Sequence, residues 1–322
     1  MNSLPATVTF VDLKPPTGSF LGDVLAGLGQ SPKALSPKYF YDARGCELFE
    51  AICELPEYYP TRTEMALMRA HAAEMAAQLD DNCVLIEFGS GAGIKTEELV
   101  RALRPAVYVP VDIAASALHA STARLAARFP DMPIIAVCAD YMQPLHLHGL
   151  ARFRKSQQVI YFPGSTIGNL TPGEAQEFLS GARVLVADGG AMLVGVDLKK
   201  DPEVLHAAYN DAQGVTAEFN LNLLHRINRE LAADFDLAHF RHVAFYNALA
   251  GRIEMHLESL RAQTVTVSGR TFGFGAGERI HTENSCKYSV AEFQRLAQAA
   301  GFRPQKFWVD AGQQFAVHLM LV

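Results

Sequence analysis

The sequence predicts an α/β fold, built on a doubly wound and mostly parallel sheet, together with a second α+β domain. Between Val84 and Asp197, short apolar runs alternate with stretches of helical periodicity, the pattern of parallel strands joined by crossover helices. Residues 199–286 interrupt this alternation with two helical segments, followed by runs in which polar and apolar residues alternate with period two. Such runs are typical of antiparallel strands, so an inserted second domain is expected there.

The composition predicts a globular protein that binds a small molecule. Of the 322 residues, 49% are hydrophobic, enough for one large or two ordinary domains. The net charge of -6 and the dispersed lysines and arginines give no basic patch for nucleic acid or an anionic membrane. The five cysteines are odd in number and scattered, which favours reduced thiols. No secretory or membrane-spanning pattern is present, so a cytoplasmic location is expected.

The chain before the alternating region is expected to be irregular to residue 19 and then to form helices at 20–28, 45–55 and 63–79. Tyrosine and phenylalanine are dense around the second of these helices, at Tyr39, Phe40, Tyr41, Tyr58 and Tyr59. Such a cluster is as compatible with core packing as with the wall of a pocket.

The alternating region is expected to contain strands at 84–88, 107–111, 134–139, 158–162 and 191–197, with helices at 95–103, 114–129 and 172–184. The insertion is expected to contain helices at 202–210 and 214–231 and strands with turns at 250–251 and 268–269. A helix at 290–300 and strands at 305–309 and 315–321 then complete the sheet with an antiparallel edge. One domain is therefore assigned to 61–198 and 287–322, and the second to 1–60 and 199–286.

The stretch VLIEFGSGAGIK, residues 84–95, predicts a ligand-binding turn between a strand and a helix. Glycine there permits positive φ and a close approach of a ligand to the main chain. A phosphate loop, G-x-x-x-x-G-K-[ST], and a dinucleotide fingerprint, G-x-G-x-x-G, would both need glycine at Ile94. A phosphate loop is thereby disfavoured, and a nicotinamide cofactor becomes the second choice.

The pattern that fits is E-x-G-x-G-x-G from Glu87, with Asp112 ending the next strand where a ribose diol would be bound. This arrangement resembles the S-adenosylmethionine site of class I methyltransferases. The cofactor-binding residues expected from it are Gly89, Ser90, Gly91, Lys95 and Asp112. A glycine turn that only packs a helix on a strand is the alternative.

Polar residues also end the third and fourth strands of the alternating region. Asp140 and Tyr141 could bind adenine through a carboxylate and an aromatic face, although an acid that caps the following turn is as compatible with Asp140. The fourth strand ends in PGSTIGN, where Gly164 and Asn169 lie. In amine methyltransferases this strand end faces the nucleophile, whereas an asparagine in a glycine-rich turn is commonly a turn residue.

Seven separated segments resemble the ergothioneine-pathway histidine Nα-methyltransferases along essentially the whole chain: PKYFYDARGCELFEAICELPEYYPTR, EFGSGAGIK, PVDIA, GSTIGNL, AAYND, RIEMHL and HTENSCKY. The resemblance implies a Rossmann-like class I methyltransferase domain and a second, substrate-binding domain, with the substrate in a cleft between them. It implies S-adenosylmethionine as methyl donor and S-adenosylhomocysteine as product. The implied reaction is trimethylation of the α-amine of L-histidine to hercynine.

The resemblance also implies a role for particular residues. Those matching the family's imidazole pocket are Tyr58, Met255, Glu283 and Ser285. Those matching the site for the amino-acid head are Gly164, Asn169 and Tyr209, with Tyr41 near the amine. Tyr41 and Asn169 are accordingly expected to act in catalysis by orienting the amine.

Methyl transfer from a sulfonium is an in-line displacement that needs a neutral amine in position, so neither a metal nor a strong base is expected. The expected partners are L-histidine and its mono- and dimethyl intermediates, and the protein is expected to be a monomer. Two alternatives stay open: a methyltransferase of the same fold acting on another amino acid or amine, and a non-catalytic cofactor-binding regulatory module. Against the first alternative, Glu283 favours an imidazole substrate over one with an apolar aromatic side chain. Against the second, the glycine loop is intact, which disfavours a non-catalytic module.

Overall fold

The computed structural model describes residues 7–13, 20–90, 94–145, 147, 153 and 155–322. The chain divides into two compact units. Unit 1 comprises Met1–Pro16, Arg62–Lys199 and Tyr288–Val322, and unit 2 comprises Thr17–Thr61 and Lys200–Lys287.

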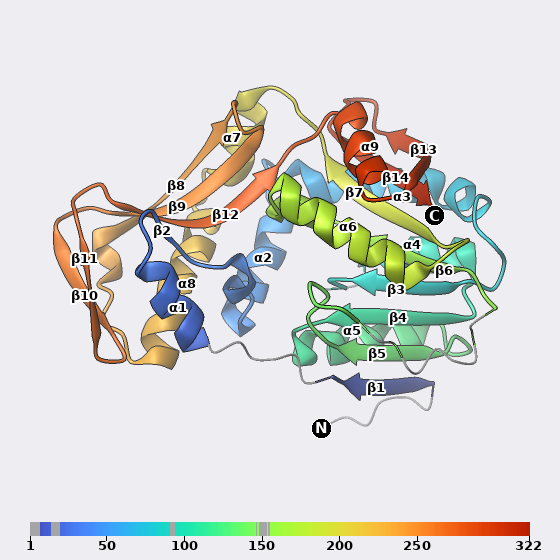
Figure 1. Ribbon diagram of the computed structural model, residues 1–322, viewed down its shortest axis with the longest axis horizontal. Coiled ribbons are helices and arrows are strands. Elements are labelled where there is room, and N and C mark those ends of the chain that lie inside the picture. Colours follow the sequence, from blue (N-terminus) through green and yellow to red (C-terminus); the bar gives the residue numbers. More distant parts are fainter. Residues whose placement is uncertain (1–6, 14–19, 91–93, 146, 148–152, 154) are drawn as a thin grey trace. The chain divides into compact units, whose positions relative to one another are not determined.

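Unit 1 is built on an eight-stranded sheet (Figure 1). In spatial order its strands are β1 (Val8–Asp12), β5 (Ile134–Cys138), β4 (Val107–Asp112), β3 (Val84–Phe88), β6 (Gln158–Phe162), β7 (Ala191–Asp197), β14 (Phe315–Leu321) and β13 (Arg303–Val309). The strands from β1 to β7 pair in parallel, and β14 is antiparallel to both of its neighbours. The predicted doubly wound sheet with an antiparallel edge is confirmed.

Helices cover both faces of this sheet. On one face α3 (Tyr59–Ala76), α4 (Ile94–Leu103) and α5 (Ala115–Arg128) pack against side chains such as Leu85 and Tyr161. On the other lie α6 (Pro172–Val186) and α9 (Val290–Ala299), drawn in front of the strands in Figure 1. Because both faces are covered, every residue of β3 and β5 is buried, as is usual for parallel strands.

Strand β1 corrects the expectation that the chain is irregular up to residue 19 and that residues 1–60 belong to the second domain. It pairs in parallel with β5, from Val8 opposite Ile134 to Asp12 opposite Cys138. It is short and lies at the edge of the sheet, so none of its residues is fully buried. A half-exposed edge strand carries little of the hydrophobic pattern by which strands are predicted.

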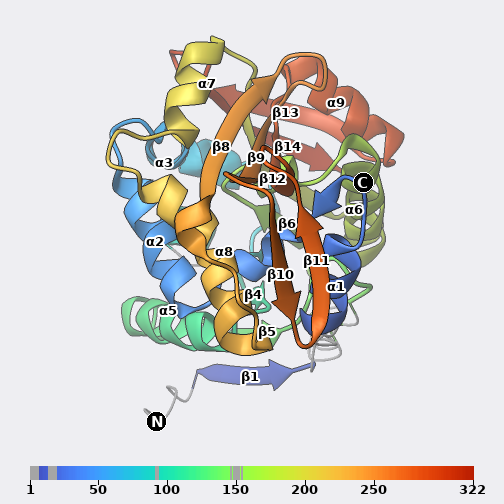
Figure 2. The same cartoon turned by 90° about the vertical axis from the view of Figure 1, so that its left-hand side faces the viewer.

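In its described residues, unit 2 combines four α-helices with a four-stranded sheet and a separate hairpin. The helices are α1 (Phe20–Leu28), α2 (Ala43–Glu54), α7 (Pro202–Tyr209) and α8 (Val215–Leu231). The sheet has the order β2 (Lys33–Ala34), β12 (Arg279–Cys286), β9 (Arg252–Ser259) and β8 (Phe240–Asn247), and the hairpin is β10 (Gln263–Val267) with β11 (Arg270–Phe274). Figure 2 shows β8, β9 and β12 side by side.

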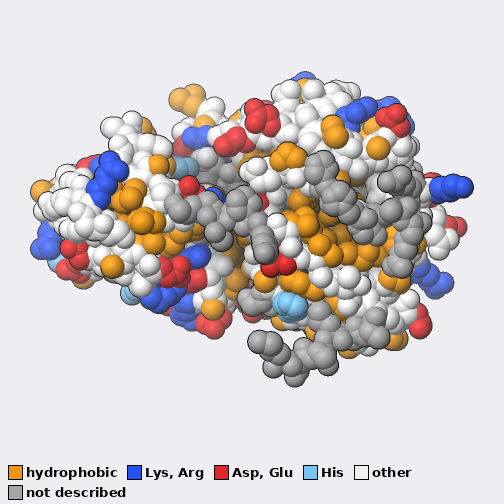
Figure 3. Space-filling view, turned by 60° about the horizontal axis from the view of Figure 1, so that its bottom comes forward, with side chains coloured by type: hydrophobic (Ala, Val, Ile, Leu, Met, Phe, Trp, Pro, Cys, Tyr) orange, Lys and Arg blue, Asp and Glu red, His pale blue; other side chains and the backbone are white. Residues whose placement is uncertain are grey.

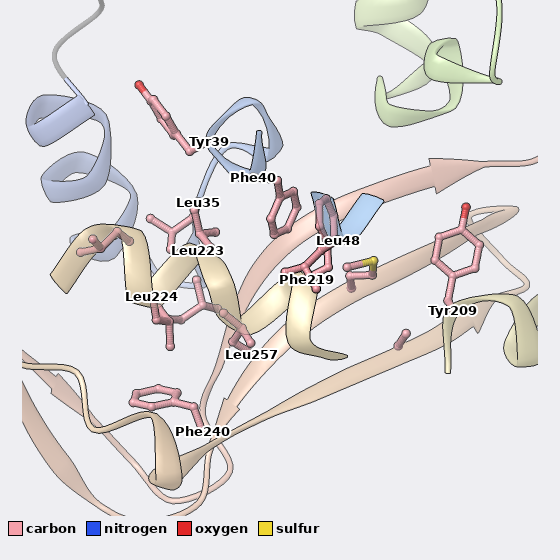
Figure 4. Close-up of a cluster of buried hydrophobic side chains, with 14 of the residues drawn as sticks. Leu35, Tyr39, Phe40, Leu48, Tyr209, Phe219, Leu223, Leu224, Phe240 and Leu257 are labelled. Atoms are coloured by element: carbon pink, nitrogen blue, oxygen red, sulfur yellow. The ribbon is translucent and has the colours of Figure 1, made fainter. Parts of the chain in front are cut away.

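The core of unit 2 forms around α8. Phe219, Leu223 and Leu224 recur at helical spacing on its buried face. They belong to one cluster with Phe40 and Leu257, drawn in Figure 4. Unit 2 therefore has a hydrophobic core of its own.

The face of the molecule drawn in Figure 3 carries charged side chains of both signs. Lysine and arginine side chains are interspersed there with aspartate and glutamate. All five cysteines are free thiols. Within the described ranges, no helix is both long and apolar enough to cross a membrane, and no three His, Cys, Asp or Glu residues gather as metal ligands would.

Candidate active site

Gly89, the first glycine of the turn after β3, has the backbone conformation that the sequence predicts for it. Gly89 has φ of 68°, in the left-handed region that glycine favours, and its amide donates a hydrogen bond to the carbonyl of Val111 at 3.0 Å. This bond joins the ends of two adjacent strands, β3 and β4. Gly91 and Gly93 lie outside the described residues.

Glu87 connects the strand before the loop with the helix after it. The hydroxyl of Thr96, near the start of α4, donates to the Glu87 carboxylate, lying 2.7 Å from both of its oxygens, and the hydroxyl of Tyr108 also bonds this carboxylate. Burial raises the pKa of Glu87 to about 7. The acid of the E-x-G-x-G-x-G pattern therefore links β3 to α4 and β4 by hydrogen bonds.

Lys95 is positioned by Glu64, a residue that the sequence analysis did not single out. The Lys95 ammonium lies 2.5 Å from Glu64 Oε2, and the amide of Gly164 donates to the two Glu64 oxygens at 3.0 and 2.9 Å. The Glu64 side chain is completely buried. This carboxylate thus joins the helix after the glycine loop to the turn after β6. It lies in an alanine-rich helix with no motif around it, and the sequence offers no signal for its role.

Asp112 and Asp140 end β4 and the segment after β5, at the same edge of the sheet as Gly89. Each Oδ1 accepts a hydrogen bond at 2.9 Å from an amide two residues ahead, that of Ala114 for Asp112 and that of Met142 for Asp140. Both acids therefore cap the turn that follows them. They lie where ligands of open α/β sheets are bound.

The ring of Tyr141 packs beside the glycine turn. It stacks on Phe88, with ring centroids 5.4 Å apart and an interplanar angle of 12°, and meets Phe162 and Phe178 edge-on. A Cβ placed on Gly89 would lie 3.8 Å from the Tyr141 hydroxyl. Tyr141 is therefore part of an aromatic cluster that borders the expected cofactor site.

Ser90, directly after Gly89, has a hydroxyl that is free to bond a further group. Its Oγ is buried and has no hydrogen-bond partner among the described residues. Buried polar atoms nearly always have partners, so this hydroxyl is available to a polar group of a ligand. The surrounding side chains fit S-adenosylmethionine: Lys95 offers a cation for a carboxylate, and Asp112 and Asp140 offer acceptors for hydroxyl and amine groups.

The turn after β6 holds both Gly164 and Asn169. Gly164 and Ser165 have φ of 77° and 57°, and the Ser165 hydroxyl accepts a hydrogen bond from the amide of Asp197 at 2.9 Å. The short helix η3 (Thr166–Asn169) follows, and the half-buried Asn169 ends it. Two consecutive left-handed residues are unusual when one is not glycine, and the Ser165 bond holds this conformation in place.

In unit 2, a β-bulge determines which residues of β12 face the core. His281 lies opposite His256 and Glu283 opposite Met255, so Thr282 is an extra residue in the strand. The Thr282 hydroxyl donates to Asn220 Oδ1 at 2.8 Å and to the Met255 carbonyl at 3.1 Å. Both Thr282 and Glu283 are buried as a result, and a strict period of two is broken.

Glu283 is a buried carboxylate without a hydrogen-bond partner in the described part of the chain. Its residue is 8% exposed, and burial raises its pKa to about 7. Met255, also buried, lies directly opposite on β9. A buried carboxylate in this state is costly unless a ligand donates hydrogen bonds to it.

Tyrosines and phenylalanines form a connected cluster in unit 2. Ring centroids are 6.3 Å apart for Tyr58 and Tyr209, 6.4 Å for Phe49 and Tyr58, and 5.7 Å for Tyr41 and Phe49. Burial raises the pKa of Tyr58, and the nearby charge of Glu283 raises it further. The Tyr58 hydroxyl therefore keeps its proton and can donate it in a hydrogen bond.

Ser285 and Tyr209 share a hydrogen-bonded group with Lys287, which the sequence analysis missed. The Tyr209 hydroxyl donates to Ser285 Oγ at 2.7 Å, and the Lys287 ammonium donates to Ser285 Oγ at 2.8 Å and to the Tyr209 hydroxyl at 3.1 Å. A signal existed, since Glu283, Ser285 and Lys287 are spaced by two in the sequence. Side chains with that spacing on a strand lie on one face.

The expected site residues thus form two groups, each within one unit. Unit 1 holds Gly89, Ser90, Lys95, Asp112, Asp140, Tyr141, Gly164 and Asn169. Unit 2 holds Tyr41, Tyr58, Tyr209, Met255, Glu283 and Ser285. The first group has the chemistry of a nucleoside site, and the second that of a small polar ring bound among aromatic side chains.

Comparison with known proteins agrees with this chemistry. A family model described as "Histidine-specific methyltransferase, SAM-dependent" matches residues 20–322. The chain is 43% identical over 303 residues to the histidine N-alpha-methyltransferase of Mycolicibacterium smegmatis, covering 92% of this chain and 93% of that protein. The enzyme of the same name from Mycobacterium tuberculosis is 42% identical with the same coverage. Ergothioneine biosynthesis protein 1 of Neurospora crassa is 29% identical over 307 residues, covering 90% of this chain and 33% of that longer protein.

Proposed function

The chain belongs to the SAM-dependent, histidine-specific methyltransferases, and from this membership we propose that it methylates the α-amine of L-histidine three times, to hercynine, the first step of ergothioneine biosynthesis. The successive substrates are then L-histidine and its mono- and dimethyl derivatives. S-adenosylmethionine supplies an electrophilic methyl carbon on a sulfonium and leaves as S-adenosylhomocysteine.

The observation that carries this proposal is the Glu283 carboxylate, buried and without a hydrogen-bond partner among the described residues. An imidazole N–H is a donor that would satisfy it, whereas an apolar aromatic side chain would leave it unpaired. The hydroxyls of Tyr58 and Ser285 belong to the same unit and suit the second ring nitrogen. Met255, opposite Glu283, supplies an apolar surface for the ring.

The residues of unit 1 support cofactor binding. We assign Gly89 and Ser90, together with Gly91 outside the described residues, to main-chain and hydroxyl contacts with the cofactor. Lys95 is assigned to its carboxylate. Asp112, Asp140 and Tyr141 are assigned to the ribose and adenine.

The chemistry at the amine needs orientation more than it needs a base. A free α-amine titrates near pH 8, so a substantial fraction is already neutral under physiological conditions. We propose that Tyr41 and Asn169 orient its lone pair, while Gly164 and Tyr209 bind the rest of the amino-acid head. Correct positioning of two reactants accelerates a displacement by several orders of magnitude. The faces of the tyrosines attract the growing cation by about 0.5 to 2 kcal/mol.

Mass spectrometry of the product tests the proposal. The protein is incubated with S-adenosylmethionine and L-histidine, and, in parallel, with L-tryptophan or L-phenylalanine at equal concentration. A product of histidine that carries three added methyl groups is expected, with little conversion of the others. Preferred methylation of another amino acid would instead support a same-fold enzyme of different specificity. Binding of S-adenosylhomocysteine without any turnover would support a non-catalytic module.

Calorimetric titration of Glu283→Ala tests the assignment of the carboxylate. Histidine affinity is expected to fall by about 100-fold, the scale of a buried charged hydrogen bond, while the affinity for S-adenosylhomocysteine stays the same. Unchanged histidine affinity would contradict the assignment of Glu283.

A further inference from the structure

Lys287 is a buried lysine directly after β12. Its residue is 2% exposed, and its ammonium lies 2.8 Å from Ser285 Oγ, 3.1 Å from the Tyr209 hydroxyl and 5.0 Å from the centroid of the Tyr209 ring. Lysine is rarely buried to this extent, because taking an ammonium out of water is costly. Both of these hydroxyls belong to expected substrate residues.

The Lys287 ammonium and the hydroxyls of Tyr209 and Ser285 each have a defined role as hydrogen-bond donor or acceptor. An ammonium only donates hydrogen bonds, whereas a hydroxyl donates one and accepts up to two. Lys287 donates to both hydroxyls, and Tyr209 donates its own proton to Ser285 Oγ at 2.7 Å. The Ser285 oxygen thus accepts two bonds, and both of its lone pairs are in use. Its proton is left to be donated to a further group.

Glu283, two residues before Ser285 in the strand, supplies a hydrogen-bond acceptor beside the Ser285 donor. Its carboxylate is an acceptor, and Glu283, Ser285 and Lys287 are all buried at a spacing of two. The charge of Lys287 also opposes the effect of burial on the pKa of Glu283 and so favours the ionised carboxylate. The strand then presents one acceptor, Glu283, and one donor, Ser285.

We propose that Lys287 is a positioning residue that makes Ser285 a hydrogen-bond donor, so that the pocket selects the neutral imidazole of the substrate in one tautomer. This inference rests on the proposed function. A neutral imidazole has one N–H, which Glu283 accepts, and one lone pair, to which Ser285 donates. An imidazolium has two N–H groups, and one of them would face the Ser285 proton.

A double-mutant cycle distinguishes this role from a structural one. Histidine affinity is measured by calorimetry for Lys287→Met, Ser285→Ala and the double variant. Lys287→Met is expected to weaken histidine binding about tenfold in the wild-type background and less than twofold in the Ser285→Ala background, because coupled residues act non-additively. Lys33→Met is the matched control, since Lys33 lies on β2, which pairs with β12, and its ammonium also lies over an aromatic ring, that of Phe274 in the hairpin, at 4.9 Å. This control is expected to leave histidine affinity unchanged.

Equal losses in both backgrounds would overturn the role of Lys287, even if the wild-type protein methylates histidine normally. Failure of the wild-type protein to bind or methylate histidine would overturn the proposed function itself and, with it, this inference. The two failures are therefore separate.

A second measurement needs no variant and applies even if Lys287→Met does not fold. Ring-labelled [15N]histidine is bound to the wild-type protein, and its nitrogen chemical shifts are recorded between pH 6 and 8. One neutral tautomer is expected throughout, including below the ordinary imidazole pKa of about 6.5. Signals of a bound imidazolium at pH 6, or of two exchanging tautomers, would overturn the proposal.

Discussion

The main-chain amide of Gly164 donates to both carboxylate oxygens of Glu64, at 3.0 and 2.9 Å. The same carboxylate holds the ammonium of Lys95 at 2.5 Å. Glu64 therefore fixes two groups at the carboxyl edge of the sheet, one on the helix after the glycine loop and one on the turn after β6. Because it is completely buried, no water can replace it in either contact.

Glu64→Gln is expected to weaken binding of S-adenosylhomocysteine by about tenfold, or about 1.4 kcal/mol. The amide removes the charge that orients Lys95, and its NH2 group cannot accept a bond from Gly164. Isothermal titration with S-adenosylhomocysteine measures the effect.

Glu74→Gln provides the control for this prediction. Glu74 lies on the same helix, α3, and likewise bonds a lysine and an N–H group, those of Lys306 and Trp308, but at a partly exposed position. Its substitution is expected to leave cofactor affinity unchanged. Equal affinity losses in the two variants would contradict a specific role of Glu64.

Gly195→Ala tests the role of the Glu64 carboxylate by adding a methyl group where that carboxylate lies. A Cβ at Gly195 would lie 2.2 Å from Glu64 Oε1, so the added methyl group must displace the carboxylate. Weaker binding of S-adenosylhomocysteine and lower thermal stability are expected, since overpacking a core costs about 1 to 3 kcal/mol. Gly181→Ala on α6 is the control, because no atom lies within 4 Å of its added Cβ. That variant is expected to be as stable as the wild type or slightly more stable.

The periodicity of the sequence was sufficient to predict seven of the eight strands of the central sheet, all but the edge strand β1, and the positions of the residues that follow its parallel strands. Expected strand 84–88 coincides with β3, and the expected helix 114–129 differs by one residue at each end from α5. The reason is physical: buried parallel strands and amphipathic helices have distinct patterns of apolar residues.

The contacts that orient the site could not be predicted in this way. Glu64 reaches Gly164 across 100 positions of the chain, and no local pattern encodes such a contact. The bulge at Thr282 is likewise decided by the partner strand, because a strict period of two would place Thr282 and Glu283 on opposite faces. Resemblance to a family indicated Glu283 and Ser285, while their common orientation required the register of β12.

Glu283→Gln is expected to stabilise the substrate-free protein at pH 8 but not in acid. The pKa of Glu283 is raised from 4.5 to about 7 by burial, so in the folded state the carboxyl holds its proton more tightly than in the unfolded state. The wild-type protein therefore loses stability as the pH rises from 4.5 to about 7, by about 3 kcal/mol when the loss is complete. Glutamine is neutral at every pH and avoids this loss. Denaturant unfolding at pH 4.5 and 8 measures the difference, and a stability gain of equal size at both pH values would contradict the assigned cause.

Thr282→Val is expected to weaken histidine binding through the β-bulge. Valine keeps the shape of threonine but removes the hydroxyl that donates to Asn220 Oδ1 and to the Met255 carbonyl. Since Asn220 is fully buried, its oxygen is left unsatisfied, at a cost of about 1 to 3 kcal/mol in unfolding free energy. Because the bulge sets the face on which Glu283 lies, histidine affinity is expected to fall about tenfold, or about 1.4 kcal/mol, with unchanged affinity for S-adenosylhomocysteine. Thr264→Val on the exposed side of β10 is the control and should change neither quantity. If Thr282→Val lowers stability but leaves histidine affinity intact, the bulge stabilises the sheet without positioning Glu283.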